Sequence, residues 1–177
     1  TNSYPVSPYT PEPDAYNNFL QPSFLIASRT IWTRCVPWEK SIWGSVVAAA
    51  ISAYRHCGRI VVTASVNHVS FTEAIPAGSI VTLEAKVSRA FTSSMEVYVD
   101  VWMENRDAKE KIKCNDAIYT FVAVDQLGTP IDVPELIPIT EKEKKRYDSA
   151  LRRRQLSLIL SGRMKAEDAT ELKALFE

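Results

Sequence analysis

The feature that most constrains the fold is a stretch of ten residues, 45–54, in which almost every position is apolar or small. It reads Ser-Val-Val-Ala-Ala-Ala-Ile-Ser-Ala-Tyr. A helix that is apolar all round must be buried on every side, and Gly58 shortly after it is a typical stop signal. The sequence therefore predicts one buried helix around which the rest of the chain is arranged.

Long segments with period-two patterning follow this helix. Residues 80–89 and 95–104 alternate apolar with polar side chains, as in Met95-Glu96-Val97-Tyr98-Val99. Such alternation indicates antiparallel strands with one face on a core. Residues 112–124 form another long strand after a charged loop at 105–111, and residues 24–32 favour a first strand. We expect an α+β fold in which the helix is followed by a meander of four long strands.

The two ends of the chain differ from this central part. Residues 1–22 contain five prolines, which remove backbone donors and fix φ, so an extended arm is expected. Thr140 and Glu143 have capping-box spacing, which predicts a helix to about Leu160, ended by Gly162, and a second short helix over 166–176. The three arginines at 152–154 are expected on a solvated helix face. The predicted organisation is an arm (1–22), a central domain (23–138) and a C-terminal helical extension (139–177).

Composition excludes several classes of function. Lys and Arg number 21, as do Asp and Glu, so no basic excess exists to bind nucleic acid. No apolar run has transmembrane length, and no signal segment opens the chain, so no membrane association is expected. Cys35, Cys57 and Cys114 lack metal-ligand spacing and are expected to be reduced thiols in a cytoplasmic protein without a metal site.

Several short motifs in the second half of the predicted helix and in the strands carry a family resemblance. They are Arg55-His56-Cys57, residues 62–71 (Val-Thr-Ala-Ser-Val-Asn-His-Val-Ser-Phe), residues 93–97 (Ser-Ser-Met-Glu-Val), Asn115-Asp116-Ala117 and residues 120–125. This set resembles the hotdog-fold acyl-CoA thioesterases, in particular the cytosolic acyl-CoA hydrolases. The resemblance implies that residues 23–138 form a hotdog domain, an antiparallel sheet wrapped around one central helix.

The same resemblance implies the activity and the assembly. Family members hydrolyse fatty acyl-CoA to free fatty acid and CoA, without a metal or redox cofactor. The expected ligand is acyl-CoA or CoA, bound at the interface of a homodimer whose sheets join edge to edge. Such dimers commonly assemble further into a hexamer, a trimer of dimers. Edge pairing also satisfies the unpaired backbone groups of edge strands.

One family motif is missing. Relatives carry Asp-Glu-Ala-Ala within the helix, and the Asp acts as general base or nucleophile. Aligned back from Arg55 without gaps, Val46 and Val47 occupy the positions of Asp and Glu; aligned with a gap, the two carboxylates are deleted. In either alignment no carboxylate lies between Lys40 and Glu73. Removal of a general base commonly costs a factor of hundreds to thousands in rate.

Two replacements are candidates for the catalytic role. Glu39 lies close to the expected helix N-terminus, although a carboxylate there also simply complements the helix dipole. Asn67 can orient water or hold the carbonyl but cannot act as a base, and the alternative is a buried, hydrogen-bonded strand residue. His56, His68 and Cys57 are weaker alternatives. Because His68 follows Asn67 directly, the two are expected on opposite faces of their strand.

The resemblance also implies CoA-binding positions, namely Arg89, Thr92, Ser93, Ser94 and Asn115. A guanidinium suits phosphate, and hydroxyls add neutral donors. The alternatives are a hairpin turn with a solvated arginine and a hydrogen-bonded position within the sheet. Three functions stay open: an acyl-CoA hydrolase, a non-catalytic CoA-binding or structural subunit, and a hotdog dehydratase, which needs a histidine paired with a carboxylate.

Overall fold

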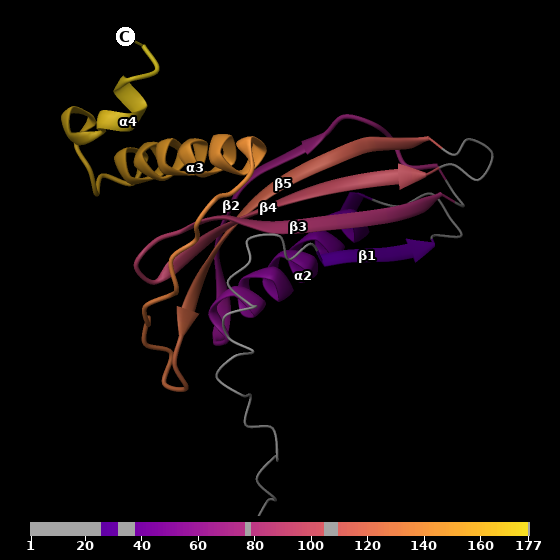
Figure 1. Ribbon diagram of the computed structural model, residues 1–177, viewed down its shortest axis with the longest axis horizontal. Helices are drawn as coiled ribbons and strands as arrows, with labels where there is room; N and C mark the ends of the chain where they lie inside the picture. The colour runs from indigo at the N-terminus through magenta and orange to yellow at the C-terminus, as the bar shows by residue number, and fades with distance from the viewer. Residues whose placement is uncertain (1–25, 32–37, 77–78, 105–109, 177) are drawn as a thin grey trace, which may run out of the picture.

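One antiparallel sheet lies between two long helices (Figure 1). The computed structural model describes residues 26–31, 38–76, 79–104 and 110–176, with side chains from residue 42 onward. The elements are β1 (Ile26–Ile31), α2 (Trp38–Cys57), β2 (Ile60–Phe71), β3 (Ile80–Ala90), β4 (Ser94–Glu104), β5 (Lys111–Val124), α3 (Glu141–Leu160), a 3₁₀ turn (Ala166–Asp168) and α4 (Thr170–Lys173). The predicted arm lies outside these residues, so the division at residues 22 and 138 stays a prediction.

The sheet has the strand order β1-β3-β4-β5-β2. Strands β3, β4 and β5 pair in sequence, but β2 pairs with β5 rather than with β3. The prediction of a four-stranded meander is therefore wrong in its connectivity, although all four strands form. Alternation along each strand fixes which side chains share a face, but it does not say which strand is the neighbour.

Small residues let α2 approach the sheet closely. Ala48, Ala49 and Ala53 are buried against the apolar face of the sheet. A Cβ atom added to Gly44 would lie 3.0 Å from Cδ1 of Leu83 on β3, which is tighter than ordinary packing. Figure 1 shows α2 along one face of the sheet and α3 along the other. We call the face that contacts α2 the inner face and the face that contacts α3 the outer face.

The opposite side of α2 is exposed, which corrects the prediction of a helix buried all round. Trp43, Val47, Ile51 and Tyr54 are 40–70% exposed, and their spacing of three or four places them along one stripe of the helix. We call these four residues the α2 stripe. An all-apolar sequence cannot distinguish a side covered by the chain's own sheet from a side left for another surface.

Strand β2 forms one edge of the sheet and is exposed over most of its length. Ile60, Val62, Val66 and Phe71 are about half exposed. The pairing of β2 with β5 shifts register twice, between Thr63 and Ser65 and between Val66 and His68. Each shift inserts one unpaired residue and changes the facing of the residues after it.

The C-terminal extension begins as predicted and then departs from the prediction. Thr140 and Glu143 form the capping box of α3, and Gly162 has a φ of 69° just after the helix. Residues 166–176 form a 3₁₀ turn and a short α4 instead of one helix. Ala169 is nevertheless buried, and the Leu172 amide donates to Oε1 of Gln155 at 2.9 Å.

The expected solvated face at residues 152–154 is wrong, because Arg153 and Arg154 point toward the sheet. Arg153 holds the buried carboxylate of Glu96 with two bonds, Nε to Oε2 at 3.0 Å and Nη2 to Oε1 at 2.7 Å. Arg154 donates to Oγ of Ser94 at 3.1 Å. Balanced flanking charge suggested a surface face, but the buried polar groups of the outer face attract these cations.

The Arg153–Glu96 pair makes a testable contribution to stability. Glu96 is 2% exposed, so Arg153→Met leaves a buried carboxylate without its cation and should lower the free energy of unfolding by about 3 kcal/mol. Urea unfolding measures this difference. The control is Lys144→Met on the same helix, whose pair with Glu141 is exposed; it should leave stability unchanged within error. Equal effects of both substitutions would contradict the assignment.

Candidate functional site

The two faces of the sheet differ in chemistry. The inner face of β4 and β5 is buried and, apart from Asn115, apolar or aromatic. It consists of Met95, Val97, Val99 and Val101 on β4, opposite Phe121, Tyr119, Ala117 and Asn115 on β5. Glu96 and Asp100 point to the outer face, where arginines of α3 bind them. In the described part of β4 and β5, the inner face therefore carries no carboxylate.

The N-terminus of α2 is polar because of its backbone N–H groups. The first-turn amides of a helix have no partner within it and carry partial positive charge, so this end can polarise a carbonyl oxygen. Glu39 lies in the first turn of α2, and its side chain lies outside the described residues. Val46 packs against the core and Val47 lies on the α2 stripe, so these two positions lie on different sides of the helix.

Asn67 lies on the outer side of β2. Its Oδ1 accepts from Oγ of Ser65 at 2.6 Å, and its Nδ2 donates to Oγ1 of Thr120 at 2.8 Å. Asn67 is exposed in the single chain rather than buried. His68 also contacts the outer face, with Nε2 3.9 Å from Oδ2 of Asp116. The expectation of opposite faces is wrong, because the register shift between Val66 and His68 interrupts the alternation.

The predicted CoA-binding residues fall into two groups. Arg89, Thr92, Ser93 and Ser94 lie together at the β3–β4 hairpin, where the amide of Phe91 donates to the carbonyl of Ser94 at 2.8 Å. Asn115 is buried opposite Val101. Because Ser94 is opposite Val122, Asn115 lies seven residues further along β5, about 23 Å away at 3.3 Å per residue. The structure therefore does not bring Asn115 to the hairpin.

Arg89 is not a solvated hairpin arginine. Its Nη1 donates to the carbonyl of Tyr147 on α3 at 3.1 Å, and its guanidinium lies 4.0 Å from the centre of the Tyr147 ring. These contacts attach the hairpin to α3 and hold the guanidinium in place. A guanidinium has five N–H donors, so Arg89 can donate to a phosphate in addition to Tyr147.

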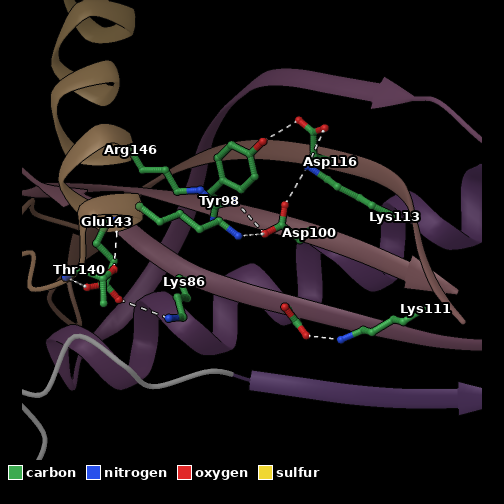
Figure 2. Close-up of polar contacts among 11 residues, drawn as sticks. Lys86, Tyr98, Asp100, Lys111, Lys113, Asp116, Thr140, Glu143 and Arg146 are labelled. Carbon is green, nitrogen blue, oxygen red and sulfur yellow. Dashed lines mark hydrogen bonds and ion pairs between the residues drawn. The ribbon is translucent and has the colours of Figure 1, made fainter.

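A cluster of charged residues on the outer face was not predicted. Asp100 binds Arg146 at 2.7 Å and Lys113 at 3.0 Å, while Asp116 accepts from the hydroxyl of Tyr98 at 2.9 Å (Figure 2). Burial alone would raise the pKa of Asp100, but the hydrogen bonds from Arg146 and Lys113 outweigh it and lower this pKa. The alternation of polar residues 96, 98 and 100 along the strand could have indicated a polar outer face. The residues of α3 that bind them could not be found from the sequence, because they are distant in the chain.

The charged cluster attaches α3 to the sheet. A carboxylate with a lowered pKa between two cations is a poor general base, because it holds a proton less readily than a free carboxylate. The acids of the outer face therefore hold α3 against the sheet and are poorly suited to act as a general base.

The weaker nucleophile and base candidates are engaged in local contacts. Nε2 of His56 lies 2.9 Å from the carbonyl of Pro134. The thiol of Cys57 donates to the carbonyl of Arg59 at 3.6 Å, and burial raises its pKa, which disfavours the reactive thiolate. Cys57 and Cys114 are free thiols. Over the described ranges, no group of three His, Cys, Asp or Glu residues could hold a metal ion, and no helix is long and apolar enough to cross a membrane.

A single helix along one face of a five-stranded antiparallel sheet, with β2 at the far edge, is the hotdog architecture. The family model described as the thioesterase superfamily matches residues 47–109. An apo-hexameric acyl-CoA thioesterase has the same fold, with a TM-score of 0.71 and 31% identity over 73% of this chain and 88% of that one. The chain belongs to the thioesterase superfamily, which confirms the fold and the family that the motifs predicted.

Two further relatives narrow the likeness. The uncharacterized acyl-CoA thioester hydrolase YkhA of Bacillus subtilis is 42% identical over 105 residues, which cover 59% of this chain and 61% of that one. An acyl-CoA hydrolase of Staphylococcus aureus, solved with butyryl coenzyme A, coenzyme A and coenzyme A disulfide, has a TM-score of 0.71 and 29% identity over 85% of this chain and 94% of that one. The chain spans less than two thirds of the length of the curated relatives it matches.

His56 should make stability depend on pH. Burial lowers the pKa of His56, with the Pro134 carbonyl opposing part of the shift. The unfolded chain therefore binds a proton more readily, and the free energy of unfolding should fall as pH decreases through about 6.5. Urea unfolding at pH 7.5 and 5.0 measures the loss, which should be smaller in His56→Gln. An identical pH dependence in the variant would assign the effect to other groups.

Proposed function

We propose that this chain hydrolyses fatty acyl-CoA to free fatty acid and CoA. The observation that carries the proposal is the shared fold and sequence likeness to acyl-CoA hydrolases, one of which was solved with CoA and butyryl-CoA. The N-terminus of α2 supports it, since its free amides suit the oxyanion that forms at a thioester carbonyl. A thiol-release assay with acyl-CoA chains from short to long tests the activity and its chain-length preference.

The proposed reaction needs a base that takes a proton from water as the water attacks the thioester carbonyl. The tetrahedral intermediate then expels CoA as a thiolate. The thiolate takes up the proton that the base removed from water. We assign Glu39 as the base, because it is the carboxylate in the first turn of α2. Asn67 remains the proposed water- or carbonyl-orienting amide, and this role requires a rearrangement from its bonds to Ser65 and Thr120. Arg89, Thr92, Ser93, Ser94 and Asn115 remain the proposed CoA contacts.

The assignment of Glu39 predicts that Glu39→Gln lowers turnover at least tenfold. Glutamine keeps the shape and hydrogen bonding of the side chain and removes its basicity, so CoA affinity should stay unchanged. Acyl-CoA turnover and calorimetric CoA binding measure the two effects. The control is Glu73→Gln. Glu73 is the next carboxylate along the chain after Glu39 and lies beyond the end of β2. Full activity of Glu39→Gln would exclude Glu39.

A non-catalytic CoA-binding subunit is the second candidate function. The specific observation in its favour is that α2, residues Trp38–Cys57, carries no carboxylate other than Glu39. A wild-type protein that binds CoA but releases no thiol from any acyl chain would support this function and contradict hydrolysis.

We propose that two chains form a homodimer through the α2 stripe and the edge of β2, and that dimers assemble into a hexamer. The supporting observations are the exposed apolar residues of both elements, the unpaired backbone edge of β2, and a relative described as hexameric. A cytoplasmic location is likewise proposed, supported by the free thiols of Cys57 and Cys114.

The proposed interface predicts that Val47→Asp reduces the assembly to smaller species. A charge within a buried apolar interface loses its hydration without gaining a partner. Light scattering at micromolar concentration measures the mass. Leu160→Asp is the control, because Leu160 is 80% exposed at the end of α3, on the other face of the sheet from α2. A monomeric wild type would contradict the proposal.

A further inference from the structure

A concave site lies on the outer face of the sheet, beneath the C-terminal half of α3. Asn67, Ser93 and Ser94 of the proposed hydrolase site contribute to its lining. The concave site is a cavity of about 280 Å³ between α3, the β3–β4 hairpin, β5 and the bulged part of β2. Its polar lining is dominated by hydroxyl groups and arginines: Ser65, Ser93, Thr120, Arg154, Ser157 and Arg163. The sheet separates it from α2.

The two guanidinium groups of this cavity carry unmatched charge. Arg154 is held by Ser94 Oγ at 3.1 Å and by the Phe91 ring, whose centre lies 4.3 Å away. Arg163 donates from Nε to Oγ of Ser161 at 3.0 Å. Neither forms an ion pair with a carboxylate among the residues that the structure describes. Burial, together with the nearby charge of Arg163, lowers the pKa of Arg154, which reports that the two cations are close.

Among the described residues, the one carboxylate that lines the cavity is already neutralised. Glu96 contributes to the wall, but both of its oxygens accept from Arg153, and Oε1 also accepts from Ser88 at 2.6 Å. Its charge is therefore matched by Arg153, which is not one of the two guanidiniums that line the cavity. The lining keeps two positive charges that an anion can offset.

A smaller cavity on the outer face provides a contrast. It measures about 110 Å³ and is lined by both acids and bases, among them Lys86, Asp100, Glu143 and Arg146. These residues form ion pairs with one another, Lys86 with Glu143 and Arg146 with Asp100. That cavity has no unmatched charge of one sign among its described lining residues, so the larger cavity is the one suited to an anion.

We propose that the larger cavity binds a phosphate group of a small ligand, with Arg154 and Arg163 as charged contacts and Ser93 and Ser157 as neutral donors. Guanidinium groups match phosphate in geometry and charge, and the hairpin and ring contacts hold Arg154 in position before binding. The phosphate can belong to the nucleotide end of CoA, a source that rests on the proposed function, or to a free anion such as pyrophosphate.

Calorimetric titration of the full chain tests the proposal with three probes: 3′,5′-ADP, inorganic pyrophosphate and adenosine. The wild type should bind the two phosphate probes and not adenosine. Arg154→Gln and Arg163→Gln should each weaken binding at least tenfold, and Arg154→Lys should restore part of it. Lys145→Gln, which removes an exposed cation of the same helix, should bind like the wild type.

The outcomes separate this proposal from hydrolysis. Arginine-dependent binding of either phosphate probe supports the cavity even if no thiol is released from acyl-CoA. Competition by CoA against bound 3′,5′-ADP assigns the nucleotide end of CoA as the source, whereas pyrophosphate binding that CoA does not displace assigns a free anion. The proposal is overturned if the wild type binds neither phosphate probe at millimolar concentration. It is also overturned if Arg163→Gln, a substitution of an exposed residue, leaves the affinity for these probes unchanged. Thermal unfolding confirms that each variant is folded.

Discussion

The close approach of α2 to the sheet is the interaction on which the rest of the structure depends. It requires small side chains on one side of the helix, and Gly44, Ala48, Ala49 and Ala53 supply them. Close packing of this kind lets the helix cover β3, β4 and β5 with few large residues, because the valines and aromatic rings of the strands fill the space between. The helix N-terminus is thereby fixed against the inner face.

The same helix is divided into two sides with different consequences. The small side forms the core of one chain, and the α2 stripe stays exposed together with the edge of β2. An apolar helix side next to an unpaired strand edge combines the two surfaces that association removes from water, apolar area and free backbone groups. One chain thus leaves an apolar side uncovered, which accounts for the proposed dimer.

Charge is segregated across the sheet. Acids of the alternating strands point outward, where Arg153 of α3 neutralises Glu96 and Arg146 neutralises Asp100. Figure 2 shows the Asp100 pair. Glu96 and Asp100 therefore do not reach the apolar inner face. For this reason the proposed hydrolysis on the inner side assigns the base to Glu39 of α2. The two arginines that the outer acids leave unmatched, Arg154 and Arg163, give that face a binding capacity of its own.

The sequence by itself determined the local structure and the family. Period-two alternation specified the long strands, Thr140 and Glu143 specified the start of α3, and the motifs around Asn67 and Ser94 specified the superfamily. Only the tertiary structure decided that β2 pairs with β5, that Asn67 and His68 share a face, and that Arg153 turns inward. Each of these depends on a bulge or on a partner distant in the chain, and local periodicity carries no information about either.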